Sequence, residues 1–390
     1  MPRSTTSFAI TVGTRGPWWP APGEWVSVED AVPSLGKPAA VMEQPINPSS
    51  GSENSPDQPY SHWNSGVEHD GYIYFYRTGG HAARAWNGLI RVGPFDTEFG
   101  PTWELLRSRS PDSVLSWCRD TFADGRPAAV HTWDAVCIAH GIPGVPDAIY
   151  SQGGSPWCNV GSASRELMYA INLDGTGEHR INVNSAYSSA APRSSLLFDP
   201  TRKEILSLNG DGGTFGYYDP AADRWSSTSN LGFSLNTYMR SVFADGPRLI
   251  GLVLGGSGGD PAELYVASAD DPSDFRLVAN VQSLLGDYGS ITYTNTIGPH
   301  GAFILGANGG RRLDKVEIPE GYRSPSVGGS SASWNVVNLQ MGGALPGQTV
   351  NGGVYKTFCS PAPGLIVMPT WTGEDPKRSE NHELFCARLP

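Results

Sequence analysis

The feature that most constrains the fold of this chain is a short pattern that recurs five times. Each copy has an apolar run typical of a β-strand, then a Gly-Gly pair, then a second run of aliphatic and aromatic residues. A Trp or Phe follows in most copies, and the clearest copy runs from Glu204 to Trp225. The pattern predicts repeated β-units rather than two or three unrelated domains. The pairs are Gly79-Gly80, Gly153-Gly154, Gly212-Gly213, Gly255-Gly256 and Gly309-Gly310.

The spacing of these glycine pairs predicts the architecture. Successive pairs are 74, 59, 43 and 54 residues apart, which matches propeller blades of about 50 residues joined by loops of variable length. A blade is a four-stranded antiparallel sheet that cannot bury both faces alone, and a ring of blades buries them. Paired glycines allow backbone conformations with positive φ, and an outer Trp would fill the wedge between neighbouring sheets. We therefore expect an all-β propeller.

The composition agrees with this expectation. With 48 Gly and 32 Pro in 390 residues, the chain lacks the long uninterrupted stretches that helical bundles and coiled coils need. A hydrophobic content of 39%, with 10% aromatic residues, is enough to bury a core and argues against disorder.

Two stretches resemble the motifs of a known repeat family. Residues 79–87 align with a first-blade motif beginning GGGH, and residues 124–134 align with a second-blade motif of the form DGxPxSRHTYD. On these stretches the chain resembles the kelch-repeat β-propellers, specifically the kelch-like proteins of bacteria and tailed phages. Ala83, Arg84 and Trp86 stand where the family motif has an acidic residue, a tyrosine and a glycine. The resemblance covers residues from about 60 to 390 and implies the fold more specifically than the function.

The repeats predict a single six-bladed ring that the N-terminus completes. The last unit has three strand-like runs and no Trp-bearing outer strand, whereas residues 25–28 have the character of such a strand. A strand from the N-terminus would close the ring and remove its open edges. Seven blades are the alternative, because residues 29–62 and 108–130 are long enough to contain further strands. Residues 1–62 are assigned to an N-terminal arm, the closing strand and a long loop, and residues 63–390 to the blades.

Charge and hydropathy exclude several classes of partner. The chain has 27 Lys+Arg against 38 Asp+Glu, a net charge of -11, and no basic run stands out, so nucleic acid is not expected as a partner. The first residues lack the apolar core of a signal peptide, and no run of about 18 apolar residues could insert into a membrane. The expected location is the virion if a phage encodes the chain, and otherwise the cytoplasm.

No cofactor or metal is predicted. The eight histidines show neither HxH nor HExxH spacing. The stretch Ser268–Phe275 is similar to a sialidase Asp-box but has no second copy, and no GxSxG nucleophile motif occurs. An odd number of cysteines without CxxC spacing predicts buried free thiols, at Cys118, Cys137, Cys158, Cys359 and Cys386.

The candidate binding residues fall into two groups. One group follows glycine pairs or begins strands, where side chains would reach the rim of the central channel. The alternative for the histidines of this group is structural, because histidines in such turns more often fix loops by hydrogen bonding. The other group is the pair of tryptophans in the N-terminal arm, and exposed aromatic rings stack on sugar faces. The candidates are Trp18, Trp19, His81, Arg84, Trp86, His131 and Trp133.

The function predicted from these observations is a non-enzymatic structural or interaction protein. The resemblance to phage-borne members and the Pro/Trp-rich arm point to a virion component, in a tail or tail-adjacent assembly, that docks onto other protein subunits and contacts a host surface glycan. Enzymatic activity is left open. The first alternative is a carbohydrate-active enzyme with a site at the mouth of the channel, which would need two suitably placed carboxylates. The second alternative is a cellular kelch-type adaptor that binds a protein.

Overall fold

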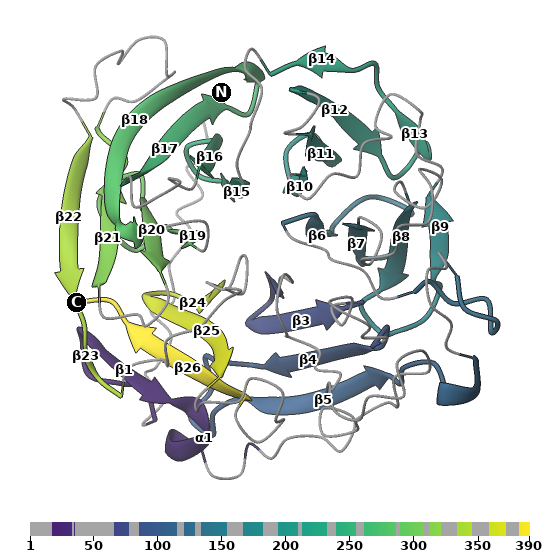
Figure 1. Ribbon diagram of the computed structural model, residues 1–390, viewed down its shortest axis with the longest axis horizontal. Coiled ribbons are helices and arrows are strands. Elements are labelled where there is room, and N and C mark those ends of the chain that lie inside the picture. The colour runs from purple at the N-terminus through teal and green to yellow at the C-terminus, as the bar shows by residue number, and fades with distance from the viewer. Residues whose placement is uncertain are drawn as a thin grey trace, which may run out of the picture.

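The computed structural model is a ring of six β-sheets around a central axis (Figure 1). The predicted six-bladed all-β propeller is therefore confirmed. The structure describes residues 18–32, 35, 66–77, 86–114, 121–128, 134–153, 167–181, 194–209, 213–231, 239–254, 261–285, 289–307, 312–320, 334–344, 359–371 and 382–390.

The first three blades are antiparallel sheets whose strands follow one another in sequence from the axis outward, with β14 as an addition that also pairs with β12. Blade 1 contains β2 (Val67–His69), β3 (Tyr72–Tyr76), β4 (Leu89–Gly93) and β5 (Thr102–Arg107). Blade 2 contains β6 (Val136–Ala139), β7 (Ala148–Gly153), β8 (Leu167–Asn172) and β9 (His179–Ile181). Blade 3 contains β10 (Ser194–Asp199), β11 (Glu204–Asn209), β12 (Thr214–Asp219), β13 (Arg224–Trp225) and β14 (Ser229–Asn230).

Blades 4 and 5 have the same order, and blade 6 combines strands from both parts of the chain. Blade 4 contains β15 (Met239–Ala244), β16 (Leu249–Leu254), β17 (Pro261–Ser268) and β18 (Asp271–Leu285). Blade 5 contains β19 (Gly289–Thr294), β20 (Ala302–Ala307), β21 (Arg312–Glu317) and β22 (Asn335–Gln340). Blade 6 contains β24 (Cys359–Ala362), β25 (Leu365–Trp371), β26 (His382–Arg388), β1 (Glu24–Ser27) and β23 (Gly342–Gly343).

Both ends of the chain meet in blade 6. Strand β1 pairs antiparallel with β26, with Trp25 opposite Ala387, and pairs in parallel with β23 on its other side. The short helix α1 (Val28–Ala31) follows β1, and the Glu29 carboxylate in it accepts a hydrogen bond from the Leu384 backbone N–H of β26. These contacts attach the N-terminal segment to the last blade (Figure 1).

Packing between blades follows from burial of both sheet faces. The inner strand β6, for example, is apolar and buried at every position. Aromatic residues beside the outer strands pack in the wedges, since Trp334 stacks on Phe303 and Trp225 packs on Tyr218. Of the repeated glycines, Gly213 has a φ of +57°, a conformation that a residue without Cβ adopts at low cost.

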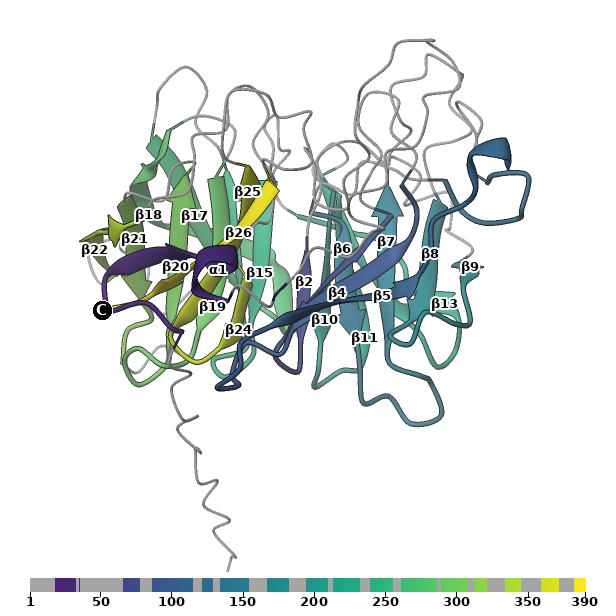
Figure 2. The same ribbon diagram turned by 90° about the horizontal axis from the view of Figure 1, so that it is seen from below.

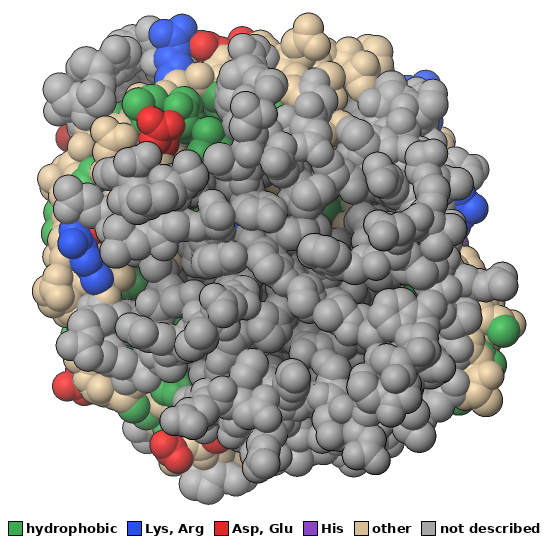
Figure 3. Space-filling view, viewed as in Figure 1, with side chains coloured by type: hydrophobic (Ala, Val, Ile, Leu, Met, Phe, Trp, Pro, Cys, Tyr) green, Lys and Arg blue, Asp and Glu red, His purple; other side chains and the backbone are tan. Residues whose placement is uncertain are grey.

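The turns that join the first and second strands of the blades lie together at one end of the ring, which we call the turn face (Figure 2). The turn-face connections around the axis include residues 70–71, 140–147, 200–203, 245–248 and 295–301. Figure 3 views the opposite face, where the described charged side chains lie at the periphery. In the described part of the chain, no helix is long and apolar enough to cross a membrane.

Candidate functional site

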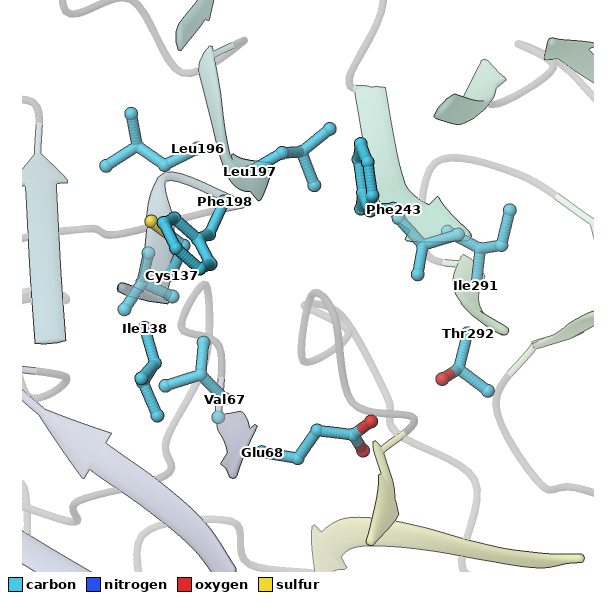
Figure 4. Close-up of a pocket in the computed structure, with 13 residues that line it drawn as sticks. Val67, Glu68, Cys137, Ile138, Leu196, Leu197, Phe198, Phe243, Ile291 and Thr292 are labelled. Carbon is cyan, nitrogen blue, oxygen red and sulfur yellow. The ribbon is translucent and has the colours of Figure 1, made fainter. Parts of the chain in front are cut away.

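A cavity of about 170 Å³ lies on the propeller axis, and the inner strands of five blades line it. Strands β2, β6, β10, β15 and β19 contribute its wall, and Figure 4 shows their side chains around a common space. Most of the wall is aliphatic or aromatic because inner strands are buried between neighbouring blades. The apolar lining includes Val67, Ile138, Leu197, Phe198, Phe243 and Ile291.

Glu68 is the charged side chain in this wall. It occupies the penultimate position of β2, and the penultimate residues of β6, β10 and β15 are the apolar Ile138, Phe198 and Phe243. The Glu68 side chain is exposed, and its carboxylate points over the cavity in Figure 4. One carboxylate oxygen accepts a hydrogen bond from the Ser360 backbone N–H of β24. This bond joins blade 1 to the neighbouring blade 6 and holds the carboxylate at the edge of the cavity.

A chain of tilted ring contacts continues from this cavity along the turn face. The rings of His69 and His140 have centroids 4.7 Å apart, and the rings of His140 and Phe198 are 5.0 Å apart. Since Phe198 also lines the cavity, these three residues, which we call the rim arc, connect blades 1, 2 and 3 around the channel mouth. Sequence reasoning missed them because each lies in a different repeat.

Charged side chains surround the rim arc. The Asp70 and Asp147 carboxylates lie 3.4 Å and 3.9 Å from His69 Nε2, and Asp147 also accepts a hydrogen bond from the Gly141 N–H at 2.8 Å. The Lys203 ammonium is 5.9 Å from the centroid of the Phe198 ring. Burial lowers the pKa of His140, and the nearby His69 and Lys203 lower it further. The mouth thus combines carboxylates, imidazoles and an ammonium within one rim.

A second polar cluster lies at the other end of the inner strands. Asp134 is 1% exposed, and its Oδ2 accepts hydrogen bonds from the Ser195 hydroxyl and from the Ser241 backbone N–H at 2.8 Å. The Ser241 hydroxyl also donates to this oxygen, at 3.0 Å. The three residues belong to blades 2, 3 and 4, so the carboxylate ties three blades together near the axis.

Three of the sequence-predicted binding residues lie in the described part of the chain. Trp18 and Trp19 donate through Nε1 to the carbonyls of Thr97 and Phe95, both at 3.0 Å. Trp18 is 9% exposed and Trp86 has no exposed surface. The prediction that Trp18 and Trp86 present open rings to a glycan is corrected here, because protein atoms cover their rings. The other predicted residues, His81, Arg84, His131 and Trp133, lie outside the described residues.

Neither a metal site nor a disulfide is found among the described residues. No group of three or more His, Cys, Asp or Glu side chains there could hold a metal ion. Cys137 and Cys386 are buried free thiols. Burial raises the pKa of the Cys386 thiol, and nearby Glu29 raises it further.

The fold is similar to those of solved propellers at low sequence identity. The GH93 α-L-arabinofuranosidase of Fusarium graminearum, in complex with arabinobiose, has a TM-score of 0.50 and 12% identity, over 88% of this chain and 96% of that chain. Kuenenia stuttgartiensis hydrazine synthase has a TM-score of 0.47 and 12% identity, over 86% and 97%. An α-L-arabinanase of Penicillium chrysogenum, complexed with arabinobiose, has a TM-score of 0.42 and 11% identity, over 90% and 97%. No protein-family model and no curated protein match the chain.

These comparisons change two of the predictions. The kelch family is not confirmed, because no family model matches and the similarity extends only to the β-propeller fold. The prediction of a non-enzymatic phage virion component is corrected as well. A propeller that this chain matches along most of its length is an arabinofuranosidase. At 12% identity, the similarity itself establishes the fold alone.

Proposed function

We propose that this protein is a carbohydrate-active enzyme that cleaves a glycosidic bond at the turn-face mouth of the channel. The observation that carries the proposal is the Glu68 carboxylate, which stands at the edge of an otherwise apolar axial cavity. Hydrolysis of a glycosidic bond generally uses two carboxyl groups, one of which protonates the leaving oxygen. The arabinofuranosidase with the similar fold makes arabinose-containing glycans the first substrates to try.

Glu68 is the group we assign to the leaving oxygen. Its carboxyl is the acidic group in the described wall of the cavity, where it can reach a bound glycosidic oxygen. Its proton would pass to the leaving oxygen as the bond from that oxygen to the anomeric carbon breaks. The hydrogen bond from Ser360 N–H fixes the position of the carboxyl group from the neighbouring blade.

The rim contributes the second acid–base group. Asp147 is the carboxylate we assign to this role, because the Gly141 N–H holds it in place and its side chain is 44% exposed. It would accept a proton from the water whose oxygen bonds to the anomeric carbon. Asp70 is less suited to the role, since its side chain is 85% exposed.

The test is turnover by the purified full chain on a panel of glycans that includes arabino-oligosaccharides. Glu68→Gln should reduce kcat by about 100-fold or more, since general acid–base groups contribute roughly 10² to 10⁴, and should leave glycan binding nearly unchanged. Glu104→Gln is the matched control, because Glu104 lies on the outer strand β5 and pairs with Arg91. Absence of turnover on the whole panel, or equal activity of Glu68→Gln and Glu104→Gln, would contradict the proposal.

A further inference from the structure

The axial cavity differs chemically from a site built for a whole oligosaccharide. Of the side chains that line it, Glu68, Thr292 and Cys137 carry polar atoms, and the others are hydrocarbon or glycine. Each inner strand pairs along one edge with the second strand of its own blade, as Val136 does with Ser151. A sugar ring buried there would find few side-chain partners for its hydroxyl groups.

The oxygen atoms of the Glu68 and Thr292 side chains are also gathered on one side. In Figure 4 the Glu68 carboxylate and the Thr292 hydroxyl lie toward one part of the cavity, whereas Leu197 and Phe243 lie opposite them. Phe198 closes a third side, and its ring is held by His140 of the rim arc. An occupant that matches this arrangement has an apolar body and a single polar atom at one end.

The volume limits the size of the occupant. A protein cavity of about 150 Å³ lined by Leu, Ile and Phe is large enough to bind benzene, and this cavity measures about 170 Å³. One six-membered aromatic ring with an oxygen substituent is therefore of a size to fill it.

We propose that the axial cavity binds a single aryl ring whose oxygen substituent faces Glu68 and Thr292. In a substrate, the bound aryl ring would be the leaving group of a glycoside. This part of the inference rests on the proposed function, and it identifies the preferred substrates as aryl glycosides with a phenolic leaving group. The phenolic oxygen would lie where Glu68 protonates it as the glycosidic bond breaks. The ring site itself does not depend on turnover.

Direct binding tests the ring site. Phenol should bind to the full-length protein in a calorimetric or NMR titration, and Val242→Phe should weaken that binding at least tenfold because the added ring occupies the cavity. The control is Leu277→Phe, a substitution of similar size at a 39% exposed position on β18. Equal phenol affinity in Val242→Phe and wild type, or no phenol binding to wild type, would overturn the inference.

A second variant keeps the test decisive if Val242→Phe does not fold. Thr292→Val retains the side-chain shape and removes the hydroxyl, so it should weaken phenol binding several-fold and leave toluene binding nearly unchanged. An equal effect on both probes would contradict the assigned orientation.

Kinetics separate this inference from the proposed function. Aryl glycosides should show a kcat/KM at least tenfold higher than methyl glycosides of the same sugar. Turnover without this preference and without phenol binding would leave the enzyme assignment standing and reject the ring site. Phenol binding without turnover on any glycoside would retain the ring site and reject the enzyme assignment.

Discussion

Two carboxylates stand beside the propeller axis, one toward each end of the inner strands, and their surroundings differ. Asp134 is 1% exposed and accepts hydrogen bonds from residues of two neighbouring blades. Glu68 is exposed, faces the axial cavity and accepts a hydrogen bond from Ser360 N–H. A carboxylate thus holds blades together in a buried place at one end, and a carboxylate is exposed beside the cavity at the other. Burial and hydrogen bonds from two blades assign a structural role to Asp134, whereas exposure beside the cavity suits Glu68 to a chemical role.

The largest effect on stability is expected from Asp134→Ala. The substitution leaves the Ser195 hydroxyl and two Ser241 donors without their common acceptor in a buried place. Because an unsatisfied buried polar group costs about 1–3 kcal/mol, the free energy of unfolding should fall by roughly 3 kcal/mol in denaturant titrations. Asp174→Ala, in an exposed turn, is the control and should have a much smaller effect. Similar losses in both variants would remove the structural role assigned to Asp134.

A smaller, pH-dependent effect is expected at His140. The folded protein lowers the pKa of this imidazole, so the unfolded chain binds more protons as pH falls below about 6.5. The stability contributed by neutral His140 should therefore be present above that pH and decline as pH falls toward its lowered folded pKa.

Denaturant midpoints between pH 5 and 7.5 measure this effect. Wild type should lose more stability over that range than His140→Gln, which cannot be protonated. His179→Gln, at an exposed position in β9, should follow the wild-type curve. A wild-type curve parallel to that of His140→Gln would show that the rim arc does not disfavour the charged imidazole.

The smallest stability effect is expected from Glu68→Gln. Its exposed side chain loses one charge-assisted hydrogen bond, and glutamine still offers an oxygen to Ser360 N–H. The free energy of unfolding should change by less than about 1 kcal/mol, while kcat falls as proposed above. A stability loss as large as that of Asp134→Ala would show that Glu68 is also a structural carboxylate, and the contrast between the two ends would disappear.

The fold followed from local patterns, whereas the site did not. Repeated apolar runs with glycine pairs predicted six blades, because strand alternation and turn residues act over short stretches of chain. Two of the Trp candidates, Trp18 and Trp86, are buried, and the indole of Trp86 packs among side chains of blades 1 and 6. The sequence did contain one indication of Glu68. It is a charged residue at a position that is apolar in the inner strands β6, β10 and β15.

The sequence by itself determined an all-β chain, its repeat and the number of its blades, because blades 1 to 5 are each encoded by contiguous residues. Only the tertiary structure decided which side chains meet at the axis. Glu68 reaches Ser360 across 292 positions, and Asp134 reaches Ser241 across 107. A closed ring brings the inner strands of all blades to one line, so residues from different repeats become neighbours there. The spacing within a single repeat carries no information about these contacts.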